Sequence, residues 1–535
     1  MSCSARGLAA LLVTLSILAC SHNNSPLNNV NTSAAGGGQS VGADFDNLAL
    51  GDIETVDLSG TKTTLDFSQA TSDDEYLLVI NATDTASSSY NLQWTGDSLP
   101  ALTMETKSES NRPEDTATQF HQLMRESENI FRETGNYKEA TVSDQAGLQV
   151  TSKVGEERSF RVLSSLNSIT AYKEITATLK LASDDVYVYL DKSSDSDLPQ
   201  AAIDKLASEF AGIALPLERA LFGPESDINA DGHITILMTC VLNQMSASGG
   251  LVTGFFFPGD LYQRNTVNPV SNAQEILYTL VPDPSGKCGT PISVDFTIKN
   301  ILPGVLAHEY QHMNSFNQHV FVNHGSTEEP WLNECLSHVT EDLTGFGNEN
   351  PSRIALFLSQ TSSTALIPST PPNLAERGAC YLFLRYLYEQ SEDGPAFLSR
   401  LYGTSKIGIA NLEQAFAGTD SDFDEFPEFL SRWSIALGLS ETGVTSDPRY
   451  NYQPRAVHLQ TGNLTGICTR CDTQDGRGTV LGGPVMATLT KYTAATNVKS
   501  TATQFYRLRQ PSGKITLNAS GNPTLVGAIA KLQKN

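Results

Sequence analysis

Short runs of alternating polar and apolar residues lie near both ends of the chain. The period of two in these runs predicts β-strands, and clusters of Gly, Ser and Asp separate one run from the next. Thr, Val and Gly-rich runs of the same kind return from about residue 440 onward. We therefore expect an N-terminal β domain with a helical linker over residues 46–145 and a C-terminal β domain over residues 441–535. Representative runs of the first region are EYLLVINATD and YNLQWTG.

The middle of the chain has longer elements of both kinds. Helical spacing near residues 116–136 predicts a helix that links the first β domain to the central part of the chain. From about residue 158, longer strands surround an amphipathic helix, and beyond residue 326 helical segments dominate. This order predicts an α+β domain over residues 146–440 with a mixed sheet and a helical lower half. The expected strands are SFRVL, YKEITATLKLAS, DVYVYLD, ITILMTC and ISVDFT.

Length and charge narrow the class of protein. A chain of 535 residues is too long for one compact core, since single cores stop growing at roughly 250–300 residues. Lys and Arg total 35 against 59 Asp and Glu, which gives a net charge of −24. That excess of negative charge argues against a nucleic-acid partner or an anionic membrane surface.

The N-terminus has the pattern of an export signal. Arg6 precedes an apolar run from Leu8 to Leu18, which is shorter than the ~20 residues needed to span a bilayer. The sequence ILAC, ending at Cys20, resembles a bacterial lipobox, in which the cysteine is acylated. The alternative is an ordinary secretory signal with a chance cysteine. We expect a signal peptide over residues 1–19 and a polar tether over residues 20–45.

These features predict a location. Ser21 after the acylated cysteine favours the bacterial outer membrane. We expect a lipoprotein that faces the cell surface or the periplasm and contacts the membrane only through its lipid anchor. Six further cysteines allow several disulfide pairings, which the sequence leaves open. For the CTRC segment at 468–471 we favour a local loop disulfide over a redox motif.

Two histidines four residues apart suggest a metal site. In GVLAHEYQHMNSFN, residues 304–317, His308 and His312 would lie one turn apart on one helix face. Both imidazoles could then reach one zinc ion, and Glu309 would point toward a bound water. A third protein ligand is needed to complete such a site.

The third ligand is expected on a second helix. A metzincin would need a glycine at Ser315 and a histidine at Gln318, so that pattern is absent. Glu334 lies in EEPWLNECLSHVTED, residues 328–342, and can ligate. Glu341, two turns later on the same face, can accept the second ring N–H of a ligating histidine.

These motifs carry a family resemblance. HEYQH with downstream WLNE resembles the gluzincins, the thermolysin-like zinc peptidases. The wider set of cues resembles the hyicolysin family of secreted metallopeptidases, over roughly residues 185–390. The resemblance implies a zincin-type catalytic domain, His308, His312 and Glu334 as zinc ligands, and Glu309 as the catalytic base. The wider cues are VYVYLD, FGPESDINADGHITIL, HEYQHMNSFN, WLNECLS and RGACYLFLRYLYEQ.

The donor that stabilises the oxyanion is less evident. In gluzincins a tyrosine or histidine has this role, and the aminopeptidase pattern YxKGA would place the tyrosine where this chain has Ala375. Tyr381 is the candidate donor, and packing within an aromatic-rich helix is the alternative.

Other polar residues receive plainer interpretations. The DINADG segment at 227–232 resembles the start of a calcium loop, but Met238 stands where an EF-hand has glutamate. An Asx-rich turn is preferred, and a Ca²⁺ ion held with help from elsewhere is the alternative. His319 and His324 are expected to be solvated loop residues, and His338 to be a neighbour of the ligands or a surface residue.

The expected function is that of a zinc-dependent endopeptidase. It would hydrolyse protein or peptide substrates by Glu-assisted attack of a zinc-bound water. One alternative is a non-catalytic surface lipoprotein that uses the same fold for protein binding, although a binder has no need of Glu309. Another is an aminopeptidase, which the absence of a GxMEN stretch disfavours.

Overall fold

The structure is a computed structural model. The signal peptide, Cys20 and most of the tether lie outside the residues that it describes. These are 43–45, 48–58, 60–71, 73–96, 116–133, 152–194, 198–245, 250–417, 423–473, 475, 478–489, 495–521 and 524–534.

Two five-stranded sheets combine strands from both ends of the chain. The first has the order β1-β3-β17-β5-β15 and the second β14-β16-β4-β18-β2. Their apolar side chains form a common core that includes Leu65, Leu78, Ile515 and Ile529. The strands are β1 (Ala43–Asp44), β2 (Ile53–Asp57), β3 (Lys62–Phe67), β4 (Asp74–Ala82), β5 (Ser89–Thr95), β14 (Ala487–Thr488), β15 (Thr496–Lys499), β16 (Thr503–Arg509), β17 (Gly513–Ala519) and β18 (Leu525–Lys534).

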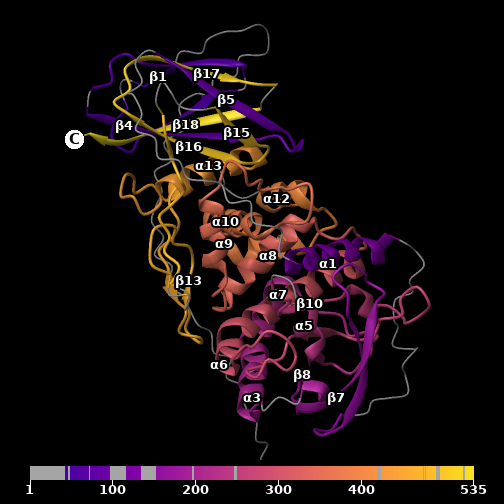
Figure 1. Cartoon of the computed structure of the whole chain (residues 1–535). Coiled ribbons are helices and arrows are strands. Elements are labelled where there is room, and N and C mark those ends of the chain that lie inside the picture. Colours follow the sequence, from indigo (N-terminus) through magenta and orange to yellow (C-terminus); the bar gives the residue numbers. More distant parts are fainter. Residues whose placement is uncertain are drawn as a thin grey trace, which may run out of the picture. The chain divides into compact units, whose positions relative to one another are not determined.

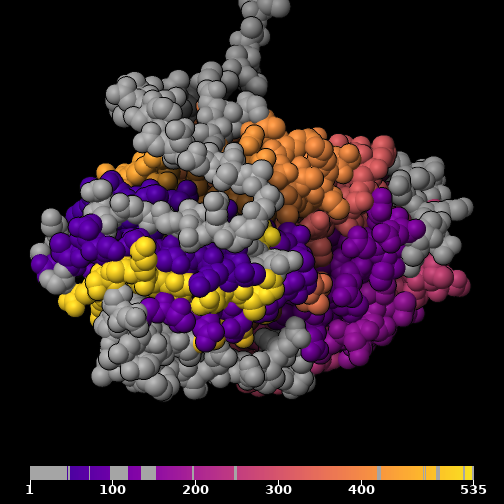
Figure 2. Space-filling model, turned by 90° about the horizontal axis from the view of Figure 1, so that it is seen from above, coloured from indigo at the N-terminus to yellow at the C-terminus, as the bar shows by residue number. Residues whose placement is uncertain are grey.

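The expectation of two separate β domains is therefore wrong. Strand β4 lies between β16 and β18 and pairs antiparallel with both. In Figure 1 indigo and yellow strands share the same sheets, and Figure 2 shows them alternating on one face. A strand buried on both edges needs two partners, and for β4 the C-terminal part of the chain supplies them. The alternating pattern predicts strands but does not say which strands pair.

A six-stranded mixed sheet lies in the middle of the sequence. Its order is β10-β11-β9-β8-β7-β6, with parallel pairing of β9 to both β8 and β11. Strand β10 is short and forms one edge of this sheet. The strands are β6 (Glu157–Leu163), β7 (Tyr172–Ala182), β8 (Val186–Asp191), β9 (Ile234–Met238), β10 (Gly254–Phe256) and β11 (Ile276–Thr279).

Helices make up most of the chain between this sheet and the C-terminal strands. The fold is thus α+β, as the sequence predicts. The helices are α1 (Thr116–Glu133), α3 (Gln200–Glu209), η2 (Phe210–Ala214), α4 (Leu215–Phe222), α5 (Cys240–Met245), η3 (Pro258–Leu261), α6 (Val294–Phe296), η4 (Thr297–Ile301), α7 (Leu302–Phe316), η5 (Asn317–Val322), α8 (Pro330–Leu343), α9 (Asn350–Leu358), α10 (Leu374–Gln390), α11 (Gly394–Tyr402), α12 (Gly408–Phe416) and α13 (Phe426–Leu439). The short segments η1 (Lys192–Ser194), η6 (Pro448–Tyr450), β12 (Ala456–Val457) and β13 (Leu464–Thr465) complete the described elements.

One predicted strand is helical. The segment ISVDFT, at residues 292–297, continues into α6 and η4. The Ser293 hydroxyl accepts a hydrogen bond of 3.3 Å from the Phe296 amide, which caps the first turn. An N-terminal cap of this kind favours a helix even where β-branched residues favour a strand.

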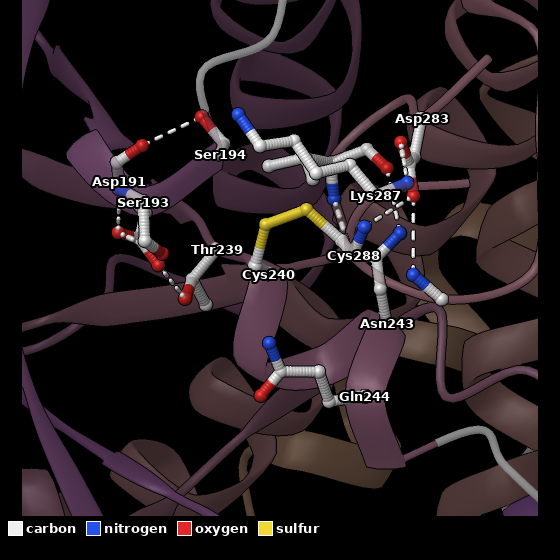
Figure 3. Close-up of a disulfide and its surroundings, with 12 residues drawn as sticks. Asp191, Ser193, Ser194, Thr239, Cys240, Asn243, Gln244, Asp283, Lys287 and Cys288 are labelled. Carbon is white, nitrogen blue, oxygen red and sulfur yellow. Dashed lines mark hydrogen bonds between the residues drawn. A yellow bond between two sulfur atoms is a disulfide. The ribbon is translucent and has the colours of Figure 1, made fainter. Parts of the chain in front are cut away.

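Two disulfides fix loops within the described chain. Cys240, at the start of α5, is joined to Cys288 (Figure 3), and Cys468 is joined to Cys471 as the local loop pairing predicts. Asp283 holds the Cys288 loop by accepting hydrogen bonds from the amides of Lys287 (2.9 Å) and Cys288 (2.7 Å). Among the described helices, none combines the length and apolar character that crossing a membrane requires.

Candidate metal centre

Helix α7 carries the HExxH segment close to the edge of the mixed sheet. Pro303 stands in its first turn, where a missing N–H costs nothing. Gly254 of β10 permits the close approach, because a Cβ atom there would lie 2.4 Å from Cγ1 of Val305. As a result Glu309 reaches the strand, and its Oε2 accepts a hydrogen bond of 2.9 Å from the Phe256 amide.

His308 lies between two carboxylates of α8. Its Nδ1 is 2.7 Å from Oε1 of Glu341, and its Nε2 is 3.3 Å from Oε2 of Glu334. Burial opposes protonation, but the two neighbouring carboxylates of Glu334 and Glu341 raise the pKa of His308 to about 9. A metal ion that binds Nε2 of His308 would have to displace the proton from this nitrogen.

Two more imidazoles surround Glu334. Nε2 of His312 lies 3.6 Å from Oε1 of Glu334, and Nε2 of His338 lies 4.0 Å from Oε2. The Ser337 hydroxyl is 3.2 Å from the His312 ring, and Nδ1 of His338 is 3.0 Å from Glu341. The structure thus brings together the five residues predicted for the centre on α7 and α8, and it places His338 beside them as a buried neighbour.

The residues fit a metal ion. Nε2 of His308, Nε2 of His338 and both carboxylate oxygens of Glu334 are buried without a hydrogen-bond partner. Ligand atoms of these three residues all lie within 4.8 Å of one another. Unpartnered buried polar atoms are costly, and a shared cation satisfies them at once. Imidazole nitrogens with a carboxylate are a donor set that suits zinc.

Two arginines lie beside the central carboxylate. Nη2 of Arg377 lies 3.1 Å from Oε2 of Glu334, and Nε of Arg125 lies 3.8 Å from Oε1. Although burial opposes ionisation, the Arg377 guanidinium in particular holds the pKa of Glu334 well below its usual range. The Glu334 carboxylate is therefore ionised.

A cavity of about 610 Å³ opens beside these residues. His308, Glu309 and Glu341 lie in its wall, so the charged groups face a space large enough for part of a peptide. Apolar side chains form much of the rest of the wall. They are Leu251, Ile292, Phe296, Ile301, Val305, Phe346 and Leu374.

Tyr381 is not brought to this cavity. It is buried in α10 and lines a separate small cavity with Asp342. Burial and the Asp342 charge raise its pKa well above the usual value, which keeps its hydroxyl protonated there. Its position agrees with the alternative interpretation, a tyrosine packed within the helix, because Arg377 one turn earlier on α10 lines the large cavity and Tyr381 does not.

The structure also bears on the predictions for two histidines and for the DINADG segment. His319 is fully buried in η5, 3.8 Å from Glu328, and is not a solvated loop residue as expected, whereas His324 is exposed. The DINADG segment at 227–232 is closed by its own hydrogen bonds, which the Gly232 amide donates to Asp227 (3.2 Å) and the Asp231 amide to Asn229 (3.2 Å). These contacts are those of an Asx-rich turn.

Helix α1 contributes side chains that the sequence did not assign to the site. It was expected to be a linker, but its His121 lines the large cavity and its Arg125 lies beside Glu334. In Figure 1 α1 lies beside α8 and just above β10, and it contacts both. Polar residues spaced three and four apart on α1 were the available signal, and they are equally typical of a solvated helix face.

Comparisons with known proteins give a distant relative. No protein-family model matches the chain. The sequence is 27% identical over 301 residues to the neutral metalloprotease ShpI of Staphylococcus hyicus. The alignment covers 55% of this chain and 65% of that protein, just under two thirds of its length. This similarity supports a metallopeptidase.

Proposed function

We propose that the chain is a hyicolysin-like zinc endopeptidase of the gluzincin type. The observation that carries the proposal is the set of buried, unpartnered atoms of His308 and Glu334, with His308 and the Glu309 carboxylate in the wall of one cavity. A general base next to a metal donor set is the arrangement that hydrolysis of a peptide bond requires. The similarity to a neutral metalloprotease supports the same chemistry.

His308, His312 and Glu334 are the proposed zinc ligands. Glu341 orients His308 through its Nδ1, which leaves Nε2 for the metal. His338 has the same relation to Glu341, so it is the candidate for a further contact. Zinc held here would act as a Lewis acid that acidifies a water molecule and polarises the peptide carbonyl.

Glu309 moves the proton in this scheme. Burial raises the pKa of Glu309, which makes its carboxylate a better base toward water. The hydrogen bond from the Phe256 amide fixes one oxygen, so the other is free to take a proton from the attacking water. As the C–O bond forms and the C–N bond breaks, Glu309 delivers that proton to the leaving nitrogen.

The geometry of the cavity suits an extended peptide. Strand β10 is an edge strand of the mixed sheet, and Glu309 and Val305 of α7 lie against it. An edge strand can pair with an added peptide strand through its backbone groups. Internal cleavage remains preferred to aminopeptidase action, because the chain lacks the GxMEN stretch that holds a free amino terminus.

A lipid anchor at Cys20 is the proposed route to the membrane. The polar tether to residue 45 would separate that anchor from the folded part of the chain. We propose an outer-membrane lipoprotein with protein or peptide substrates and no nucleic-acid partner. A non-catalytic binding lipoprotein is the alternative function.

The test is the Glu309→Gln variant. It keeps the size of the side chain and removes no proposed ligand, so zinc content should equal that of the wild type. Cleavage of casein, blocked by 1,10-phenanthroline in the wild type, should fall by roughly 10²–10⁴-fold or more. Glu392→Gln, at an exposed glutamate outside the cavity, is the matched control. Equal digestion by Glu309→Gln would refute the assigned base, and zinc-loaded wild type without any digestion would favour the binding lipoprotein.

A further inference from the structure

Helix α1 presents a polar stripe to the metal centre. Thr118, His121, Arg125, Glu128 and Arg132 are spaced three and four apart, which places them on one helix face. Thr118 and His121 line the cavity that contains Glu309. One turn further along, Arg125 reaches Glu334 at 3.8 Å, and Glu128 then accepts a hydrogen bond of 3.2 Å from Asn333. His121 therefore lies one helical turn from Arg125, whose guanidinium is next to the proposed ligand Glu334.

A neighbouring face of α1 is fixed in the protein core. Phe120, Met124 and Phe131 are buried in the same apolar cluster as residues of α7 and the mixed sheet. The Phe120 ring meets Phe255 edge-on, with centroids 5.1 Å apart, and Phe131 meets Phe257 in the same way at 5.3 Å. These contacts hold α1 against β10 and η3 while its polar stripe faces α8. The helix is thus part of the wall of the site.

The His121 imidazole is available as a hydrogen-bond donor. Desolvation and the nearby Arg377 charge hold the pKa of His121 well below its usual value, so the ring is neutral and carries one N–H. Within the described part of the chain, no hydrogen bond engages this ring. The two arginines in the cavity wall already have partners. Arg377 lies 3.1 Å from Glu334, and Arg353 donates a hydrogen bond to Asn350.

Peptide hydrolysis creates a need for such a donor. When water attacks the carbonyl carbon, negative charge develops on the carbonyl oxygen, and a fixed donor there lowers the barrier. Tyr381, the donor expected from the sequence, lies in another cavity. We propose that His121 donates its N–H to this oxygen in the transition state. The inference rests on the proposed endopeptidase function. The His121 proton stays on the imidazole ring, while Glu309 alone carries the proton from water to the leaving nitrogen.

The kinetic test uses the full chain loaded with zinc. His121→Ala should lower kcat about 10²–10³-fold, as loss of one oxyanion donor does elsewhere, and change KM less than about threefold. Zinc content and thermal unfolding should match the wild type. His121→Gln, which keeps an N–H donor, should recover part of kcat. Gln122→Ala is the matched control, because Gln122 is the next residue of α1 but donates to the Pro371 carbonyl.

Several outcomes would overturn the proposal. Unchanged kcat in His121→Ala would do so, as would equal losses in His121→Ala and Gln122→Ala, which would show only a disturbed helix. Higher activity in His121→Ala would mean that α1 blocks the cavity. These results leave the endopeptidase function intact when the wild type still hydrolyses peptides and Glu309→Gln does not.

A binding measurement covers the case of undetected hydrolysis. A phosphinic peptide carries a tetrahedral, anionic centre like the transition state, and a substrate peptide bound to Glu309→Gln does not. His121→Ala should weaken binding of the phosphinic peptide about 10²-fold and leave binding of the substrate peptide within about threefold. Equal weakening of both peptides, or no binding of either by the zinc-loaded wild type, would overturn the proposal. Failure of the wild type to bind zinc would instead refute the proposed function and the inference with it.

Discussion

Glu341 lies 2.7 Å from Nδ1 of His308, a residue 33 positions earlier in the chain. The same carboxylate oxygen is 3.0 Å from Nδ1 of His338. Because His338 and the Arg353 charge help to hold the pKa of Glu341 well below its usual range despite burial, this carboxylate is ionised and accepts from both rings. One side chain thus directs two imidazoles so that their Nε2 atoms face Glu334.

Glu341→Gln should therefore weaken zinc binding without abolishing it. The amide keeps the size of the side chain but is a weaker acceptor for the His308 N–H, and such changes typically cost 10–100-fold in metal affinity. Competition with a chromophoric chelator measures the change. Glu392→Gln, an exposed glutamate, serves as the control. Equal zinc affinity in wild type and Glu341→Gln would show that this contact does not support the metal.

The roles of His312 and His338 can be separated. We expect His312→Ala to lose stoichiometric zinc, because the proposed ligand set would fall from three to two. His338→Ala should keep one zinc per chain at reduced affinity. Metal analysis of both purified variants by mass spectrometry decides the matter. The reverse result would make His338 the third ligand, in agreement with its position within 4.8 Å of the other ligand atoms.

The interleaved strands predict that damage near the C-terminus exposes the N-terminal strands. Ile529 of β18 is fully buried between the two sheets. Ile529→Asp places a charge there and should cost more than about 3 kcal/mol. Limited proteolysis followed by mass spectrometry should then find new cuts within residues 53–95. Lys514→Ala, at an exposed side chain of β17, is the control. Resistance of residues 53–95 in the Ile529→Asp variant would contradict a shared sandwich.

Asp260 predicts a dependence of stability on pH. Burial raises its pKa to about 7, even though the Asn272 amide (2.5 Å) and the Tyr278 hydroxyl (2.7 Å) donate to it. Since the folded pKa exceeds the unfolded value of 3.8, its contribution is greatest below about pH 4 and declines as the pH rises through about 7. Asp260→Asn should lose less stability than the wild type between pH 5 and pH 8. Thermal unfolding of both proteins at each pH measures this difference, and parallel curves would refute it.

The lipid anchor gives a separate test. Cys20→Ser removes the proposed acylation site but leaves the described fold untouched. We expect this variant to appear in the soluble fraction of expressing cells with unchanged peptide hydrolysis, while the wild type sediments with membranes. Membrane association of Cys20→Ser would rule out the lipobox interpretation.

Local patterns in the sequence predicted the parts of this protein that depend on neighbouring residues. The helical spacing of His308 and His312 and the face shared by Glu334 and Glu341 follow from 3.6 residues per turn. Alternation likewise predicted strands at both ends of the chain. Each of these inferences needs only a few consecutive residues, and the structure has these elements.

Only the tertiary structure decided which distant segments meet. Strand alternation is the same whichever partner a strand has, so the pairing of β4 with β16 and β18 was not accessible from local pattern. In the sequence, the polar stripe of α1 resembles a solvated helix face. In the structure, α8 packs against this stripe and Arg125 is buried next to Glu334. For the same reason the sequence did not reveal that His121 lines the large cavity and that Tyr381 lies away from it. The positions of α10 and α1 relative to the other helices determine which ring lines this cavity, and both positions depend on packing between segments far apart in the chain.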